Sequence, residues 1–149
     1  MTATADVTIA PQLYQIFIRT SPEALWQAIT EPDFTARYFH GARIGREGDD
    51  RWVLHGPDGS IWGDEGLIEW DAPRRLVTGW RSLYSPEFAS EPSSRVMWEI
   101  IETTPGVCKL TVLHDRLESS PKTAANVSGA GWMHVLSTLR SFLETGQSL

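Results

Sequence analysis

One histidine stands where it could carry out acid–base chemistry. His114 lies in the stretch of residues 107–115, VCKLTVLHD, in phase with the apolar Leu110 and Val112. Because alternate residues of a strand share a face, this phase turns the imidazole toward the apolar side. There it could orient a ligand by a hydrogen bond or exchange a proton with it. The alternative is a histidine at the edge of the core, bonded to the backbone, while Asp115 faces solvent.

The sequence predicts neither a metal site nor a cofactor. Cys108 is in phase with His114, but six strand residues separate them, roughly 20 Å at about 3.3 Å each, too far to share a zinc ion. The other histidines fall on different predicted elements without ligand spacing: His40, His55 and His134.

Two further groupings fail as catalytic sites. Glu99 falls on the solvent-facing phase of its strand, so Glu99 and Glu102 do not form a carboxylate pair for sugar hydrolysis. The stretch SGAG at 128–131 lacks the serine spacing of a nucleophile elbow and the lysine of a phosphate loop. The remaining candidate for an acid or base, beside His114, is Asp64.

Composition excludes several classes of partner. The chain has 149 residues, 13 basic and 19 acidic, and its net charge of −6 without a basic run argues against nucleic acid and anionic membranes. A single cysteine cannot form an internal disulfide, and no signal peptide or apolar span stands out, so we expect a cytoplasmic protein. The seven tryptophans indicate either a bulky core or a cavity with aromatic walls.

The order of predicted elements indicates an α+β fold. A strand over 12–20 is followed by a helix that begins at Ser21-Pro22-Glu23, and by a second short helix after Pro32. A run of strands follows, with 83–93 as a loop between two of them. A final helix begins near Ser119-Ser120-Pro121 and ends near Gly146. This order predicts an antiparallel sheet covered on one face by helices.

The final helix presents an apolar stripe to the sheet. Trp132, Leu136, Leu139 and Leu143 recur at helical spacing, which is typical of an amphipathic helix packed on a core. Two glycines, Gly129 and Gly131, come directly before Trp132 and weaken the helix at this point. We interpret them as the entrance of a cavity beside the tryptophan.

Five stretches of the chain together resemble one superfamily. They are FIRTSPEALWQAIT, EPDFTARYF, DAPRRLVTGWR, LTVLHD and the closing GW followed by VLSTLRSFLETG. In this order, over about residues 12–146, the chain resembles the SRPBCC or START-like superfamily, and within it the activator-of-Hsp90-ATPase-like group. The resemblance implies a helix-grip fold, in which a curved antiparallel sheet wraps a long C-terminal helix around a cavity. Members bind lipids, steroids, polyketides or other apolar molecules, and some catalyse cyclisation, dehydration or hydrolysis.

These observations predict a single domain over 12–146, with a flexible N-terminus at 1–11 and a short tail at 147–149. We expect it to bind a small hydrophobic, aromatic or polyketide-like ligand; a homodimer is left open. The alternatives are an enzyme on the same fold and a chaperone-activator-like interaction module. The predicted pocket residues are Trp26, Phe34, Trp52, Ile68, Trp80, Val96, Trp98, Leu110, Val112, His114, Trp132 and Leu136.

Overall fold

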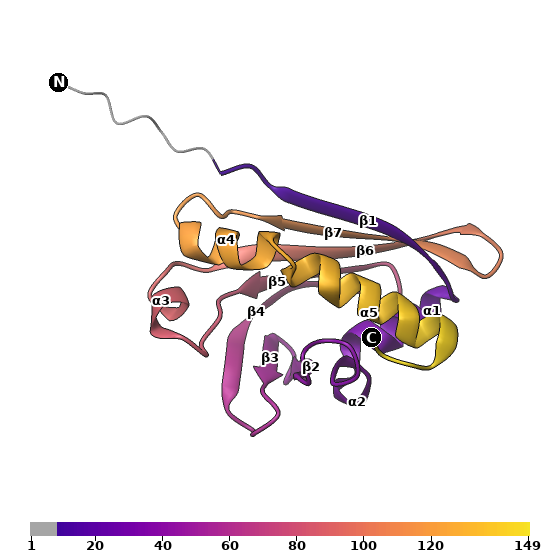
Figure 1. Cartoon of the computed structure of the whole chain (residues 1–149), viewed down its shortest axis with the longest axis horizontal. Helices are drawn as coiled ribbons and strands as arrows, with labels where there is room; N and C mark the ends of the chain where they lie inside the picture. The colour runs from indigo at the N-terminus through magenta and orange to yellow at the C-terminus, as the bar shows by residue number, and fades with distance from the viewer. Residues whose placement is uncertain (1–8) are drawn as a thin grey trace.

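The computed structural model describes residues 9–149 (Figure 1). Its elements are β1 (Gln12–Arg19), α1 (Pro22–Thr30), α2 (Pro32–Thr35), β2 (Arg43–Glu47), β3 (Arg51–His55), β4 (Ile61–Asp71), β5 (Arg75–Trp80), α3 (Pro86–Ala89), β6 (Ser94–Thr104), β7 (Val107–Asp115), α4 (Pro121–Ser128) and α5 (Gly131–Thr145). The prediction for residues 1–11 falls largely outside the described residues. No helix from residue 9 onward is long and apolar enough to cross a membrane.

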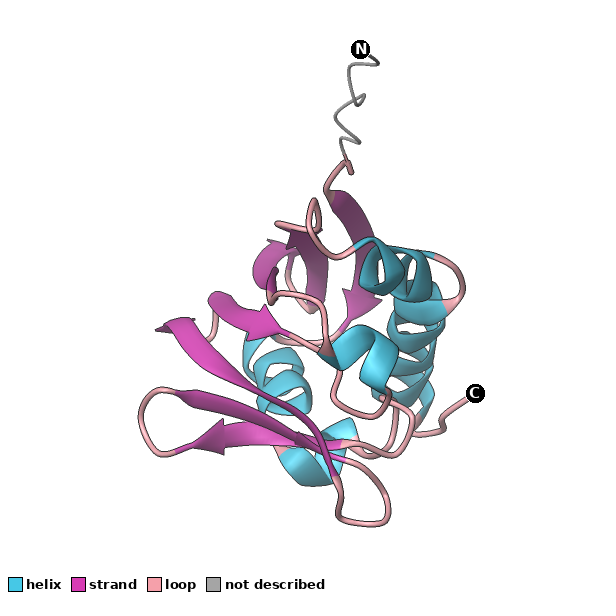
Figure 2. Cartoon of the chain, turned by 90° about the vertical axis from the view of Figure 1, so that its left-hand side faces the viewer, coloured by secondary structure: helices cyan, strands magenta, loops and turns pink. Residues whose placement is uncertain are grey.

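The strands form one antiparallel sheet of seven strands in the order β1-β7-β6-β5-β4-β3-β2. The sheet curves, and the helices gather on its inner side, as Figure 2 shows. Helix α5 contacts β1 and α1, while α1 also contacts β6 and β2. This is the helix-grip arrangement, so the predicted fold class is confirmed.

Helix α1 begins where its sequence signals predict. The Ser21 hydroxyl accepts a hydrogen bond from the Ala24 N–H at 3.1 Å, and Pro22 occupies the first turn, where no N–H is needed. The helix ends at Glu31, directly before Pro32, because the residue before a proline avoids the helical conformation. Its buried side carries Trp26, which fixes α1 over one end of the sheet.

The expected single C-terminal helix is divided in two. Helix α4 ends at Ser128, and the Gly129 backbone, at φ −64° and ψ −118°, leaves the helical region before α5 begins at Gly131. The far end matches the prediction, because Gly146 adopts the left-handed conformation at φ 80° that closes many helices. The loop predicted at 83–93 contains the short helix α3.

One predicted inward position is wrong. Ile68 is 57% exposed on the outer face of β4, whereas its neighbour Leu67 packs against the core. The pairing of β4 with β5 shifts register between Leu67 and Glu69. Because side chains alternate along a strand, a shift of one residue exchanges the two faces. β6 and β7 pair in regular register from Arg95 to Glu102, and their inward residues there are buried: Val96, Trp98, Leu110, Val112 and His114.

Candidate functional site: an aromatic cavity

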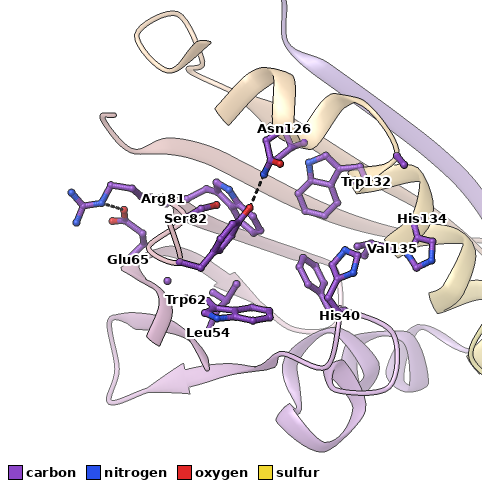
Figure 3. A pocket seen from close by; sticks show the side chains of 18 residues that line it. His40, Leu54, Trp62, Glu65, Arg81, Ser82, Asn126, Trp132, His134 and Val135 are labelled. Atoms are coloured by element: carbon purple, nitrogen blue, oxygen red, sulfur yellow. Dashed lines mark hydrogen bonds and ion pairs between the residues drawn. The ribbon is translucent and has the colours of Figure 1, made fainter. Parts of the chain in front are cut away.

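A cavity of about 720 Å³ opens beside the junction of α4 and α5 (Figure 3). Its floor comes from the ends of β4 and β5, and its sides come from α5 and the residues after α2. Aromatic side chains dominate its wall: Phe39, Trp62, Trp80, Tyr84 and Trp132. A concave apolar site of this size is typical of small-molecule binding.

Three aromatic rings meet at the inner wall. The Trp80 and Trp132 ring centroids lie 5.6 Å apart, and Phe39 lies 6.1 Å from Trp80 and 6.0 Å from Trp132. These separations fall in the range of favourable edge and tilted aromatic contacts. The three rings come from a strand, a loop and a helix, so the tertiary fold alone brings them together.

The outer wall is formed where the chain continues past the end of β5 alongside β4. The Leu83 N–H donates to the Trp62 carbonyl oxygen at 2.8 Å, which ties this segment to β4. Five of its residues line the cavity: Gly79, Trp80, Arg81, Ser82 and Tyr84. The Trp62 ring lies against Gly56, where any Cβ atom would collide with it.

His114 lies behind the wall and holds it in place. The Trp132 indole Nε1–H donates to His114 Nδ1 at 3.1 Å, so the imidazole proton is on Nε2, 2.6 Å from the Ser94 hydroxyl oxygen. Ser94 in turn donates to the Trp80 carbonyl oxygen at 3.3 Å. Burial lowers the pKa of His114 to about 4, against the opposing pull of Asp115. His114 is therefore neutral, and both of its ring nitrogens are occupied.

The charged residues of the cavity are already paired. The Glu65 carboxylate accepts a hydrogen bond from the Ser93 hydroxyl at 2.5 Å and lies 3.5 Å from Arg81 Nε. Asp64, the other acid considered from the sequence, bonds Arg51 Nε at 3.0 Å and is not among the lining residues. The cavity is thus close to electrically balanced.

A side-chain hydrogen bond crosses the opening of the cavity. The Asn126 side-chain N–H donates to the Tyr84 hydroxyl at 2.7 Å, joining α4 to the segment after β5 (Figure 3). Tyr84 is 51% exposed, and Asn126 is also at the surface. We call this bond the latch, because it joins the two sides where the cavity opens; further along the same segment, Glu91 accepts hydrogen bonds from the first turn of α4. Gly131 also lines this region, and a Cβ there would come within 3.2 Å of the Asn126 carbonyl oxygen.

Two histidines form the rim opposite Tyr84. The His40 and His134 rings stack with centroids 5.4 Å apart and planes within 11° of parallel. Burial and the neighbouring His134 lower the pKa of His40, so this ring favours its neutral form. Within residues 9–149, no group of three or more His, Cys, Asp or Glu side chains is arranged to hold a metal ion.

Of the residues predicted to line a pocket, Trp80 and Trp132 lie in this wall. Phe34 is half-buried against Phe142, and Ile68 points outward. The others are buried in the packed core: Trp26, Trp52, Val96, Trp98, Leu110, Val112, His114 and Leu136.

Sequence reasoning missed lining residues at a strand end, in loops and on the helices α4 and α5: Phe39, His40, Trp62, Ser82, Tyr84, Asn126 and His134. Alternation of apolar residues does not extend into such segments. The only sequence signal there is the presence of large aromatic residues, Trp62 and Tyr84, beside turns.

Comparison with known proteins identifies a related family. A sequence model described as activator of Hsp90 ATPase homolog 1-like protein matches residues 19–144. Among curated proteins, no sequence matches the chain.

Similar folds occur among solved structures. An HSP90 activator from Plasmodium falciparum is 20% identical with a TM-score of 0.71, over 89% of this chain and 95% of that one. The Aha1 dimer from Colwellia psychrerythraea is 16% identical with a TM-score of 0.71, over 94% and 100%. DynU16, a putative protein in the dynemicin biosynthetic locus, is 20% identical with a TM-score of 0.73, over 93% and 48%.

Proposed function

The chain belongs to the activator of Hsp90 ATPase homolog 1-like family, and from this premise we propose that it binds one small, largely apolar, aromatic molecule. The observation that carries the proposal is the cavity of about 720 Å³ with aromatic side chains on its floor, inner wall and opening. Burial of a flat ring against such walls gives affinity, and the few polar groups give orientation.

The wall is organised before a ligand arrives. Trp132 is 2% exposed and is fixed by its hydrogen bond to His114, while Trp80 is held between Phe39 and Trp132. Side chains that are already ordered lose little conformational entropy on binding, so more of the contact energy appears as affinity. This supports a binding site in preference to a gap left by poor packing.

The proposal is tested by filling the cavity from its rim. Ala130 is an exposed lining residue at the start of α5, so Ala130→Phe adds a ring to the opening without disturbing the core. We expect saturable one-to-one binding of the tricyclic aromatic fluorene to the wild-type chain, measured by quenching of tryptophan fluorescence. Ala130→Phe should weaken it by about tenfold or more, since losing about 1.4 kcal/mol of contact has that effect.

Ala125→Phe provides the matched control. Ala125 is an exposed residue of α4 that does not line the cavity, so this variant should bind fluorene as the wild type does. If neither fluorene nor related aromatics bind the wild-type chain, the proposal fails. Equal weakening by both variants would place binding elsewhere.

A second candidate function is action on a chaperone, favoured by the family and by the similarity to the Plasmodium falciparum HSP90 activator. In that case the outer surface would carry the activity, and filling the cavity would leave it intact. Addition of the chain to a purified Hsp90 measures this directly. Stimulated ATP hydrolysis that is equal for the wild type and Ala130→Phe would support the chaperone function over ligand binding.

A further inference from the structure

Two imidazole rings stand at the rim of the cavity, next to its aromatic inner wall. His40 directly follows Phe39 in the chain, and the centroids of their rings lie 6.2 Å apart. His134 lies two residues beyond Trp132 on α5, and its ring stacks on that of His40. A flat ligand bound against Phe39 and Trp132 therefore brings its edge close to the His40 ring.

The backbone of His40 adopts an uncommon conformation. Its φ of 54° is left-handed, which glycine adopts freely and other residues seldom do, although histidine does so more often than most. The turn is anchored nearby, since the Ala42 N–H donates to the Phe39 carbonyl oxygen at 2.9 Å. Gly41 lies so close to Pro57 that a Cβ would come within 2.9 Å of the proline ring. Such conformations gather at ligand-binding sites, where the surrounding fold fixes a side chain in position.

The imidazole of His40 is available to a ligand. Within residues 9–149, the histidine rings that form hydrogen bonds are those of His55 and His114. Both His40 and His134 are exposed where they line the opening. Burial and the neighbouring His134 lower the pKa of His40, so its neutral ring offers one N–H donor and one acceptor nitrogen.

A hydroxyl group suits this ring better than a charged group does. A hydroxyl can donate to the acceptor nitrogen or accept from the N–H. A carboxylate has no proton to donate, and only a protonated ring would offset its charge, which the lowered pKa of His40 disfavours. In Figure 3, Arg81 and Glu65 lie on the side of the cavity away from the histidines, so neither supplies a counter-charge at this rim.

Resting on the proposed function, we infer that the ligand is a hydroxylated aromatic molecule, a phenol on a fused-ring frame, whose hydroxyl group forms a hydrogen bond with His40. Its apolar body lies against Phe39, Trp80 and Trp132, and its polar edge lies toward the opening. His40 is thus a residue that sets specificity, and His134 supports the His40 ring by stacking on it.

Three probes with the same tricyclic frame test this inference: fluorene, 2-hydroxyfluorene and fluorene-2-carboxylate. Calorimetric titration of the wild-type chain at pH 7 should give a dissociation constant about five- to tenfold lower for 2-hydroxyfluorene than for fluorene, the effect of one net hydrogen bond. Fluorene-2-carboxylate should bind more weakly than 2-hydroxyfluorene. These comparisons need no variant, so they stand even if a substitution perturbs folding.

His40→Phe should remove the preference for the hydroxyl group. The phenyl ring keeps the stack on His134 but has no nitrogen, so we expect 2-hydroxyfluorene to weaken by about five- to tenfold and fluorene to stay unchanged. His40→Gly relieves the left-handed backbone and should likewise bind both probes equally, which makes the result independent of strain in the first variant. His55→Phe is the matched control, because His55 lies outside the cavity wall and should keep the preference.

Four outcomes overturn the inference. Equal affinity of the wild-type chain for fluorene and 2-hydroxyfluorene refutes hydroxyl recognition while the proposed function stands. Tighter binding of fluorene-2-carboxylate than of 2-hydroxyfluorene refutes it in favour of an anionic ligand. A preference that survives in both His40 variants, or that disappears only in His134→Phe, places recognition elsewhere on the wall. If no probe binds, the inference and the proposed function fail together.

Discussion

Tryptophans fill the core at one end of the sheet and line a cavity at the other. Beneath α1 and α2, Trp26 and Trp52 pack edge-on against Trp70, with ring centroids 5.1 Å and 6.4 Å apart. The gap left beside Trp52 there measures about 10 Å³, no more than one water needs. Beneath the α4–α5 junction, Trp62, Trp80 and Trp132 surround about 720 Å³ instead. We call these the packed end and the hollow end.

The difference lies in what covers the sheet. At the packed end, α1 and α2 lie over the strands and their side chains fill the space, although the backbone leaves the helical conformation at Glu31 between them. At the hollow end, α4 and α5 meet at Gly129, and the segment after β5 faces them, joined to α4 by the hydrogen bond between Tyr84 and Asn126. Residue type does not separate the two ends, since both are rich in tryptophan. How closely the covering segments pack on the sheet does.

The largest expected effect is a difference in stability between alanine variants of two tryptophans on neighbouring strands. Trp52→Ala, in β3 at the packed end, should lower the free energy of unfolding by about 3–5 kcal/mol, because it leaves a cavity in a filled core. Trp62→Ala, in β4 at the hollow end, should lower it by about 1 kcal/mol and weaken fluorene binding. Urea denaturation measures both. Equal losses of stability would show that the hollow end is packed in solution.

The next effect is a pH dependence of stability that comes from His114. Its folded pKa of about 4 lies below the unfolded value of about 6.5, so the unfolded chain binds the proton more readily. Stability should therefore be complete above pH 6.5 and fall by about 3 kcal/mol as the pH drops to 4. Thermal unfolding across this range measures the slope.

Two substitutions distinguish the contribution of the buried His114 to this pH dependence from that of His40 at the rim of the cavity: His114→Gln and His40→Gln. His114→Gln should remove most of the slope and lower stability at pH 7, because Trp132 and Ser94 lose their shared partner. His40→Gln replaces an exposed ring and should keep most of the slope. A slope that is unchanged in His114→Gln would assign the pH dependence to other groups.

The smallest expected effect concerns the latch at the hollow end. Tyr84→Phe removes one surface hydrogen bond and keeps the ring, so stability should change by less than about 0.5 kcal/mol. Ligand release should nevertheless become about two- to fivefold faster, since the hydrogen bond across the opening itself is lost. Stopped-flow tryptophan fluorescence measures this rate. Asn126→Ala should have the same effect, and the double variant should add nothing to it; unchanged release rates would reduce the latch to a surface contact.

Local chemistry explains which features were predictable. Ser21 and Pro22 start α1, Gly146 ends α5, and the regular alternation of β6 and β7 turns Trp98 and His114 inward. Each of these features depends on a few neighbouring residues. Ile68 was misplaced because the register shift in β4 depends on how β4 pairs with β5, which its own alternation does not reveal.

The position of the cavity, unlike these local features, depends on the tertiary structure. The sequence determined the elements, their order and which tryptophans turn inward, because capping, turns and alternation act over a few residues. Only the tertiary structure decided that Trp26 and Trp52 lie in filled space and that Trp80 and Trp132 face a cavity with Ser82 beside them. Empty volume depends on how distant segments cover one another, and no short stretch of sequence records that.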